Sequence, residues 1–328
     1  MKKTLLILMV ALLAMTIVFA QGQAEASKSE VKYPTKEITV IIPWNPGGTN
    51  DLVGRAMQPI FKEMYNVDIV IKNVPGGGSA VGILEATNAK NDGYTLGIAT
   101  SSFLALMAQG RVESTLESTS NMMAFMEEPI ILVVKNNGKY ADAKALLEAM
   151  KANPGQVSCG VPGSNNVNQA YATLLQEEVG SEFNFMPFSG GSRVVAELIG
   201  GHIDCGVLKP SETIAQVKAG ELKVVGVFNK DGVSVMPDVP TFESLGYDVF
   251  RLGNIQQMAY VMGPKDIDPQ VQAKIVEMFT GVLKSDAFKK FADETGVQIN
   301  IQTGADFDKY IAEVYSGLEK ASEEIFSK

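Results

Sequence analysis

The residues of this 328-residue chain that are best placed to bind a ligand lie in three short loops rich in Pro, Gly, Ser and Asn. The loops cover residues 43–50, 162–166 and 187–192, and each follows an apolar segment and precedes an amphipathic one. A helix N-terminus offers N–H groups without intrahelical partners, together with the positive end of the helix dipole. In open α/β sheets, ligands lie beyond the carboxyl ends of the strands. Three such junctions therefore predict a site for a small anion.

Two further polar positions follow apolar segments in the same way. Residues 100–101 follow an expected strand at 94–99, and Lys209 follows an expected strand at 203–208. Together with the three loops, these positions supply the candidate ligand contacts, none of which is proposed as a metal ligand. The candidates are Trp44, Gly47, Gly48, Thr49, Asn50, Asp51, Thr100, Ser101, Gly163, Ser164, Asn165, Asn166, Ser189, Gly190 and Lys209.

Three side chains in or near these segments have two interpretations each. Trp44 is the only tryptophan, and it can either wall off a ligand or anchor its loop in the core. Lys209 and Arg193 lie beside expected strand ends or helix starts, where a solvated surface charge is the ordinary interpretation. The alternative for Lys209 is contact with a second carboxylate of the ligand, because a lysine there adds a charge beside dipoles that already favour an anion.

Catalytic and metal-binding chemistry have little support in the sequence. His202 is the only histidine, and no G-x-S-x-G segment supplies the nucleophile of a serine triad. A zinc site built from His and Cys lacks ligands for the same reason. The segment GGGSAVG at 76–82 resembles a dinucleotide fingerprint only weakly, and a glycine turn before a helix is the simpler interpretation. The sequence therefore predicts a binding protein without a cofactor rather than an enzyme.

The N-terminus has the pattern of a cleavable secretory signal. Lys2 and Lys3 precede an apolar stretch at 5–19, which is shorter than a membrane-spanning helix requires. Small residues suitable for cleavage follow, so we expect a signal peptide over residues 1–20, with cleavage as late as residue 26. No cysteine follows the apolar stretch, so the exported protein is expected to carry no lipid anchor.

The overall charge and the two cysteines limit the partners and the covalent structure. The formal net charge is −9, and loss of Lys2 and Lys3 with the signal lowers it to −11, which disfavours binding to nucleic acid or to anionic membranes. Export makes a disulfide between Cys159 and Cys205 chemically possible. Two small buried thiols are the favoured interpretation, because adjacent parallel strands rarely bring two Cβ atoms close enough for a disulfide.

Strands and helices alternate along the chain, which predicts mostly parallel sheets flanked by helices. The expected strands are 38–42, 67–71, 94–99, 129–134, 157–161, 183–186, 203–208, 222–228 and 258–262. The expected helices are 80–89, 142–151 and 212–218, together with others beginning at Asp51, near Asn168 and at Arg193, Asp268, Asp286 and Asp306. Pro59 lies inside the first of these helices and is expected to kink or interrupt it.

Six short motifs occur in an order typical of one family. The segment PWNPGGTND at 43–51 matches the Pro-aromatic-x-Pro-Gly-Gly-x-x-Asp signature of the Bug receptors, the periplasmic solute-binding components of tripartite tricarboxylate transporters. The other motifs are NVPGGG at 73–78, DGYTL at 92–96, GGHID at 200–204, KAGELK at 218–223 and PDVPT at 237–241. The chain resembles this family over essentially its whole expected mature part.

The resemblance implies a type II-like periplasmic-binding-protein fold, that is, two α/β domains with a ligand cleft between them. We expect domain I to comprise 34–130 and 236–328, and domain II to comprise 131–235, with hinge crossovers near Ile130 and Met236. In such receptors, backbone amides of the first and second loops hold a carboxylate with the help of hydroxyls and ordered waters. Arginine pairing is not their main device.

The function implied by the resemblance is capture of a small organic carboxylate in the periplasm by a monomer. The solute would then pass to an inner-membrane permease with one large and one small subunit. Two alternatives remain open. A carboxylate-sensing receptor would use the same cleft and dock on a membrane sensor kinase, and an exported hydrolase would need a nucleophile–base pair. The sequence leaves the identity of the carboxylate open.

Overall fold

The computed structural model describes residues 31–230, 232–233, 235–253 and 255–327. One compact unit, Pro34–Lys328, contains all the helices and strands of the described residues. The expected signal peptide, residues 1–20 with a cleavage region up to residue 26, lies outside the described residues. Within the described part of the chain, no helix combines the length and the apolar character that a membrane crossing requires.

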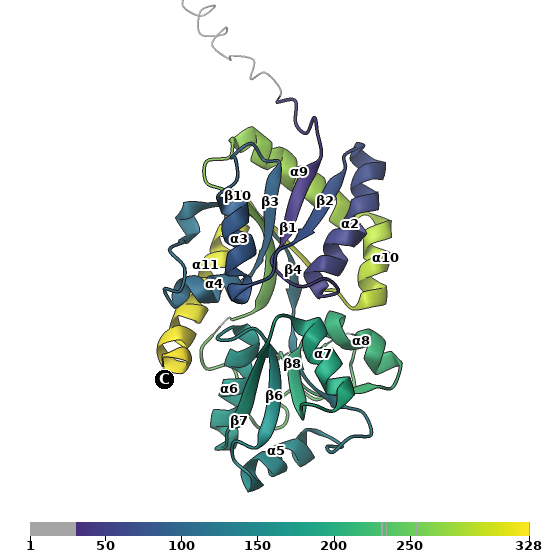
Figure 1. The fold of residues 1–328 in the computed structure, drawn as a ribbon, viewed down its shortest axis with the longest axis vertical. Coiled ribbons are helices and arrows are strands. Elements are labelled where there is room, and N and C mark those ends of the chain that lie inside the picture. Colours follow the sequence, from purple (N-terminus) through teal and green to yellow (C-terminus); the bar gives the residue numbers. More distant parts are fainter. Residues whose placement is uncertain (1–30, 231, 234, 254, 328) are drawn as a thin grey trace, which may run out of the picture. The chain divides into compact units, whose positions relative to one another are not determined.

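The first of two sheets in this unit has the strand order β11-β4-β10-β3-β1-β2 (Figure 1). Its strands are β1 (Ile38–Ile42), β2 (Ile69–Asn73), β3 (Thr95–Thr100), β4 (Thr119–Glu128), β10 (Gln257–Pro264) and β11 (Ile299–Thr303). The helices around it are α2 (Thr49–Tyr65), α3 (Ala80–Thr87), α4 (Ser101–Ala108), α9 (Pro269–Lys284), α10 (Asp286–Thr295) and α11 (Gly304–Ala321). Short helical turns occur at Gly77–Ser79, Leu116–Ser118 and Ser322–Phe326.

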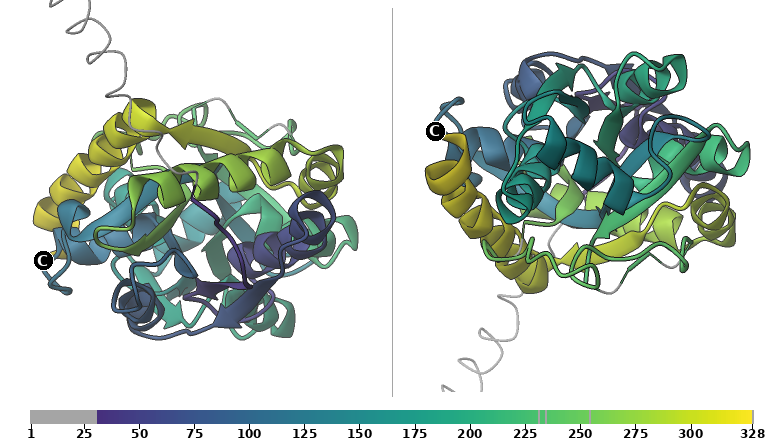
Figure 2. Two further views of the ribbon diagram at one scale, coloured as in Figure 1. Left: turned by 90° about the horizontal axis from the view of Figure 1, so that it is seen from above. Right: turned by 90° about the horizontal axis from the view of Figure 1, so that it is seen from below.

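The second sheet has the strand order β7-β6-β8-β5-β9. Its strands are β5 (Ile130–Lys135), β6 (Val157–Pro162), β7 (Phe183–Phe188), β8 (Cys205–Leu208) and β9 (Leu222–Phe228). The helices around it are α5 (Ala143–Ala152), α6 (Val167–Val179), α7 (Gly191–Gly200) and α8 (Pro210–Lys218). Figure 2 shows α9 across the first sheet in one end view and α5 across the second sheet in the other. We call each sheet with its helices a lobe.

Both sheets are mixed rather than mostly parallel. In the first sheet β1 runs parallel to β2 and β3, but β10 is antiparallel to β3 and β4, and β11 is antiparallel to β4. In the second sheet β6 is parallel to β7 and β8, whereas β5 is antiparallel to β8 and β9. The difference arises at the strands where the chain enters each lobe from the other one. β10 enters the first lobe and is antiparallel to β3, and β5 enters the second lobe and is antiparallel to β8. The expected α/β architecture with two sheets flanked by helices is nevertheless present.

The strand–loop–helix units form as expected, although the helices begin slightly earlier. α2 begins at Thr49, α6 at Val167 and α7 at Gly191. Pro59 does not interrupt α2, which continues to Tyr65. The proline is exposed, so water can hydrate the backbone carbonyl that loses its intrahelical partner there.

The chain passes from the first sheet to the second through Pro129 alone, between β4 and β5, and it returns between β9 and β10. One hydrophobic cluster contains side chains of both lobes, including Phe103 of α4 and Tyr171 of α6.

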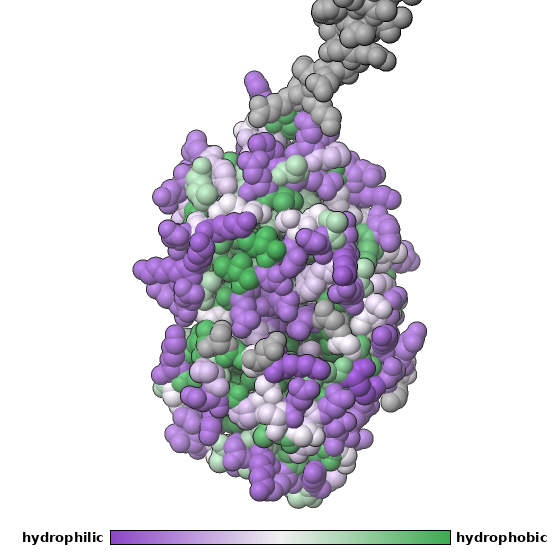
Figure 3. All heavy atoms as spheres, turned by 180° about the vertical axis from the view of Figure 1, so that it is seen from behind, coloured by the Kyte–Doolittle hydropathy of each residue, from purple (hydrophilic) through white to green (hydrophobic). Residues whose placement is uncertain are grey.

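Cys159 and Cys205 are free and fully buried, opposite each other on β6 and β8, in agreement with two small buried thiols. The expected domain boundaries stay a prediction. Figure 3 shows a mostly hydrophilic face with smaller hydrophobic areas.

Candidate ligand-binding site

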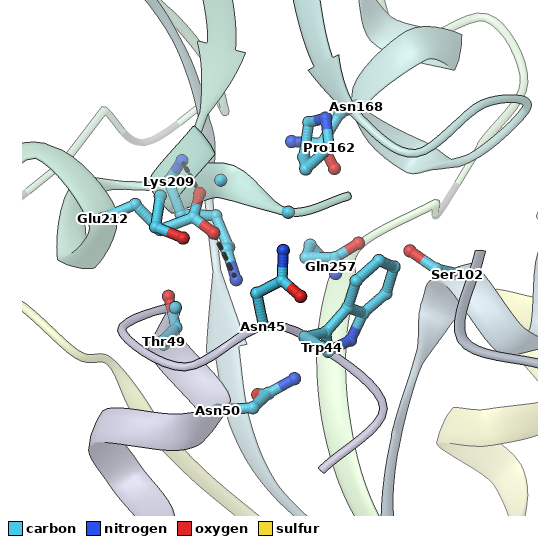
Figure 4. Close-up of a pocket in the computed structure, with 14 residues that line it drawn as sticks. Trp44, Asn45, Thr49, Asn50, Ser102, Pro162, Asn168, Lys209, Glu212 and Gln257 are labelled. Atoms are coloured by element: carbon cyan, nitrogen blue, oxygen red, sulfur yellow. Dashed lines mark hydrogen bonds and ion pairs between the residues drawn. The ribbon is translucent and has the colours of Figure 1, made fainter. Parts of the chain in front are cut away.

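Segments from both lobes enclose a pocket of about 430 Å³ (Figure 4). This volume includes space that is open to solvent. Figure 4 places Lys209 and Glu212 together on one side of the pocket and Trp44 with Ser102 on the other. The lining residues are Trp44, Asn45, Gly48, Thr49, Asn50, Ser102, Pro162, Asn168, Gly190, Gly191, Ser192, Lys209, Glu212 and Gln257.

Two helices with a glycine at the N-cap begin at the pocket without a side-chain cap. The N-cap residues are Gly48 for α2 and Gly190 for α7, and neither can supply a capping side chain. The first residues of both helices line the pocket, and the two helices belong to opposite lobes. The first N–H groups and the dipole end of α2 are therefore available to an anion, whereas the Glu212 carboxylate already lies against Gly191 at the start of α7.

Asp51 does not line the pocket, although it was a sequence candidate. Its carboxylate accepts hydrogen bonds from the N–H of Gly47 at 2.9 Å and from Arg55 at 3.0 Å. Burial acts to raise the pKa of Asp51, but the hydrogen bonds from Arg55 and Gly47 outweigh it and hold that pKa below its ordinary value. Asp51 thus fixes the turn at Gly47, which has a φ of 85°. Gly47 also lies outside the lining.

The second predicted loop contributes only its first residue, and the neighbouring helix α6 contributes one more. Pro162 and Asn168 line the pocket, whereas residues 163–166 do not. The side chain of Asn166 caps α6 by accepting from the N–H of Gln169 at 3.1 Å and donates to the carbonyl of Pro162 at 2.7 Å. Gly163 is near the Trp44 ring, and Ser164 is exposed. Asn165 donates its N–H to the Gln169 side chain at 2.7 Å.

Thr100 and Ser101 are buried and hold the backbone in place. The Thr100 hydroxyl accepts from the N–H of Ser102 at the start of α4. The Ser101 hydroxyl donates to the carbonyl of Gln256 at 2.6 Å and accepts from the N–H of Met258 at 3.0 Å. Ser102, one residue further on, lines the pocket in their place.

Side-chain hydrogen bonds join the two lobes around the pocket. Asn45 donates to Ser189 at 2.6 Å, which explains the position of Ser189 beside the pocket rather than in its lining. The hydroxyls of Thr49 and Ser211 are 2.6 Å apart. Gln109, directly after α4, donates to the carbonyl of Asn165 at 2.7 Å. Asn45 and Thr49 line the pocket, so the first two bonds lie at its edge, and we call the three inter-lobe bonds together the rim.

A buried ionic cluster occupies one side of the pocket. The Lys209 ammonium is 3.4 Å from the Glu212 carboxylate and 3.8 Å from the Glu128 carboxylate, and Glu212 also accepts the N–H of Lys209 at 3.1 Å. Lys209 is only 6% exposed, so its interpretation as a solvated surface charge was wrong. Arg193, in contrast, is exposed and pairs with Glu197.

Glu128 is fully buried at the end of β4, opposite Gln257 of β10. Burial raises the pKa of Glu128 to about 7, although the Lys209 ammonium acts in the opposite direction. Neither carboxylate oxygen has a hydrogen-bond partner of ordinary geometry. Ser211 is close enough to favour the ionised form slightly, but its hydroxyl shares the hydrogen bond with Thr49.

Two amide oxygens of the lining are also buried without a partner. They are Oδ1 of Asn50 and Oε1 of Gln257, and the two side chains belong to residues that are 3% and 6% exposed. A buried acceptor without a donor is costly, so each such oxygen calls for a hydrogen-bond donor from solvent or ligand.

The sequence candidates that line the pocket are Trp44, Gly48, Thr49, Asn50, Gly190 and Lys209. The lining residues that sequence reasoning missed are Asn45, Ser102, Pro162, Asn168, Gly191, Ser192, Glu212 and Gln257. Most of them lie within three residues of a candidate, so wider windows around each junction would have included them. Gln257 is the exception, because only the pairing of β10 with β4 brings it to the pocket.

No group of three or more His, Cys, Asp or Glu residues in the described part of the chain could hold a metal ion. His202 is exposed and pairs with Glu197 through Nδ1 at 2.8 Å. The residues 76–78 form a turn of three glycines with positive φ before α3, as the simpler interpretation of that segment predicted.

Comparisons with known proteins agree on one family. The model of the family described as tripartite tricarboxylate transporter family receptor matches residues 53–324. BugT of Bordetella pertussis is 26% identical over 284 residues, which cover 85% of this chain and 86% of BugT. A solved periplasmic transporter is 27% identical, with a TM-score of 0.82 over 89% of this chain and 98% of its own. MatC of Rhodopseudomonas palustris, solved with bound malate, has the same fold at 18% identity, with a TM-score of 0.74 over 90% of this chain and 98% of MatC.

Proposed function

This chain belongs to the receptor family of tripartite tricarboxylate transporters, and we propose that it captures a small organic carboxylate and delivers it to the permease of such a transporter. The resemblance noted in the sequence is thereby confirmed. The family and the solved neighbours are solute-binding proteins, so the chain is a periplasmic binding protein and not an enzyme.

One observation carries the proposal of a carboxylate ligand. The uncapped N-termini of α2 and α7 come from opposite lobes and line the same pocket. A carboxylate held at the end of α2 would lie in a pocket that both lobes line, which links ligand binding to the approach of the two lobes. The malate bound to MatC supports a carboxylate as the class of ligand.

The remaining parts of the proposal concern export, partners and motion. A cleavable signal at residues 1–20 would release the protein into the periplasm as a monomer without a lipid anchor. A large and a small membrane subunit would then receive the solute. The lobes, with the boundaries expected from sequence, would move about the passage at Pro129 and the return between β9 and β10.

A thermal-shift screen tests this function. Protein purified without refolding is screened against mono-, di- and tricarboxylates, amino acids and aromatic acids, with neutral sugars and inorganic cations as controls. A ligand bound only by the folded state raises the melting temperature by mass action, so at least one carboxylate should do so. Native mass spectrometry of the same sample should detect any solute retained from the cell. Stabilisation by sugars or cations alone would refute the proposal.

A further inference from the structure

The charge distribution of the pocket narrows the class of carboxylate that it can accept. Lys209 and Glu212 supply the only charged side chains in the lining. Glu212 balances Lys209 through contacts with both its ammonium and its backbone N–H. Glu128 lies outside the lining but close to the Lys209 ammonium, and it adds at most one further negative charge. The cluster therefore carries a net charge of zero or −1, and it gives a second ligand carboxylate no unbalanced cation.

Besides the free N–H groups at the start of α2, the pocket has buried side-chain atoms without a partner, and these are acceptors. Oδ1 of Asn50 and Oε1 of Gln257 are buried without a donor, and both side chains line the pocket. The Glu128 carboxylate, opposite Gln257 on the paired strand, likewise accepts no hydrogen bond of ordinary geometry. A carboxylate of the ligand offers only lone pairs and cannot satisfy these atoms, whereas an ammonium offers three N–H donors.

We infer that the ligand carries a protonated amine as well as a carboxylate, and that the Glu212 carboxylate receives the amine on the side of the pocket that it shares with Lys209. The inference rests on the proposed function, because the carboxylate of the same ligand would occupy the uncapped N-terminus of α2. Gln257 and Asn50 would accept the remaining N–H groups. Glu212 thereby becomes the residue that selects amino-carboxylates over simple dicarboxylates.

Matched ligand pairs test this selectivity by titration calorimetry at pH 7.5. The pairs are aspartate with succinate and 4-aminobutyrate with butyrate, so each pair differs by one amine. In one pair or both, the wild-type protein should bind the compound that carries the amine at least tenfold more tightly than the compound that lacks it. Glu212→Gln should reduce that ratio to about threefold or less, because the amide keeps the shape of the side chain but lacks its charge. Glu197→Gln, on the same lobe and outside the lining, should leave the ratio unchanged.

A second variant keeps the test decisive if Glu212→Gln does not fold. Gln257→Leu removes a buried acceptor on β10, in the other lobe, and should also reduce the ratio. The inference is overturned if neither amine binds more tightly than its amine-free partner, or if malate binds while all four probes fail. Failure of every carboxylate in the screen would instead refute the proposed function itself, so the two failures are distinguishable.

Discussion

The loops before α2 and before α6 are similar in composition and follow parallel strands, yet they have different roles. The loop at 43–50 ends on Gly48, which leaves the first N–H groups of α2 uncapped at the pocket. The loop at 162–166 ends on Asn166, whose side chain caps α6. A helix N-terminus that satisfies its own N–H groups has little to offer an anion. The residue at the N-cap therefore decides which junction can bind a ligand.

The largest change in the free energy of unfolding is expected at Glu128, which lies outside both loops. Its pKa is raised by burial to about 7, so between about pH 4.5 and 7 the folded protein keeps a proton that the unfolded chain has lost. Stability is thus lost as the pH rises through this window, by about 3 kcal/mol for this group. Glu128→Gln should remove that loss, so its advantage over the wild type should grow by about 3 kcal/mol between pH 4.5 and 8. Urea unfolding at both pH values measures it.

The control for this experiment is Glu148→Gln, which alters an exposed carboxylate in α5. It should reproduce the pH dependence of the wild type. An equal difference between Glu128→Gln and the wild type at both pH values would contradict the assignment of the buried proton to Glu128.

The next effect concerns the uncapped end of α2. Thr49→Pro and Thr49→Val both lose the hydroxyl that contacts Ser211, but only proline also removes the backbone N–H. Proline is tolerated at the first position of a helix, and Gly48 has the extended backbone that a following proline requires. A charge-assisted hydrogen bond contributes about 1.5–3 kcal/mol, so Thr49→Pro should bind the tightest carboxylate of the screen about 10- to 150-fold more weakly than Thr49→Val. Calorimetry that gives equal affinities would place the carboxylate elsewhere.

The two glycines at the start of α7 give a third comparison. A methyl group at Gly191 would overlap the Glu212 carboxylate, whereas one at Gly190 would meet open space. Gly191→Ala should therefore displace Glu212 from Lys209 and cost about 1–3 kcal/mol of stability, as overpacking usually does. Gly190→Ala should stay within about 0.5 kcal/mol of the wild type. Denaturant unfolding distinguishes them, and equal stabilities would show that Glu212 is free to move.

The smallest effect is expected in the capped loop. Asn166→Ala should lower stability by about 1 kcal/mol, because loss of an N-cap side chain typically costs that amount. It should leave the affinity for carboxylates unchanged, since Asn166 does not line the pocket. Asn166→Asp keeps the capping acceptor but places a carboxylate oxygen against the Pro162 carbonyl, so it should not restore full stability. A large loss of affinity in Asn166→Ala, measured by calorimetry, would return this loop to the ligand site.

The sequence predicted the junctions because Pro, Gly and Asn mark the turns and apolar segments mark the strands. It did not predict β4, whose segment TSNMMAFMEE lacks the β-branched apolar residues typical of a strand. Without β4, the antiparallel half of the first sheet was missing, and both sheets were expected to be mostly parallel.

The candidate site was predicted only in part, because some of its features depend on tertiary pairing. Glu128, Lys209 and Gln257 are far apart along the chain and meet only where β4 ends beside β10 and α8 begins. No local pattern could show that the charge of Lys209 is balanced. Likewise, the loop at 162–166 was placed in the site because its composition could not reveal that Asn166 would cap its own helix.

The hydrogen bonds of the rim have a consequence for the residence time of a bound solute. Asn45 with Ser189, Thr49 with Ser211 and Gln109 with Asn165 must separate before the lobes part and a solute leaves. Each bond contributes about 0.5–1.5 kcal/mol, which corresponds to about twofold to tenfold in a dissociation rate. Removing one of them should therefore shorten residence while the association rate changes less. Thr49 belongs both to the rim and to the uncapped end of α2. One residue therefore influences both how tightly the solute is bound and how fast it is released.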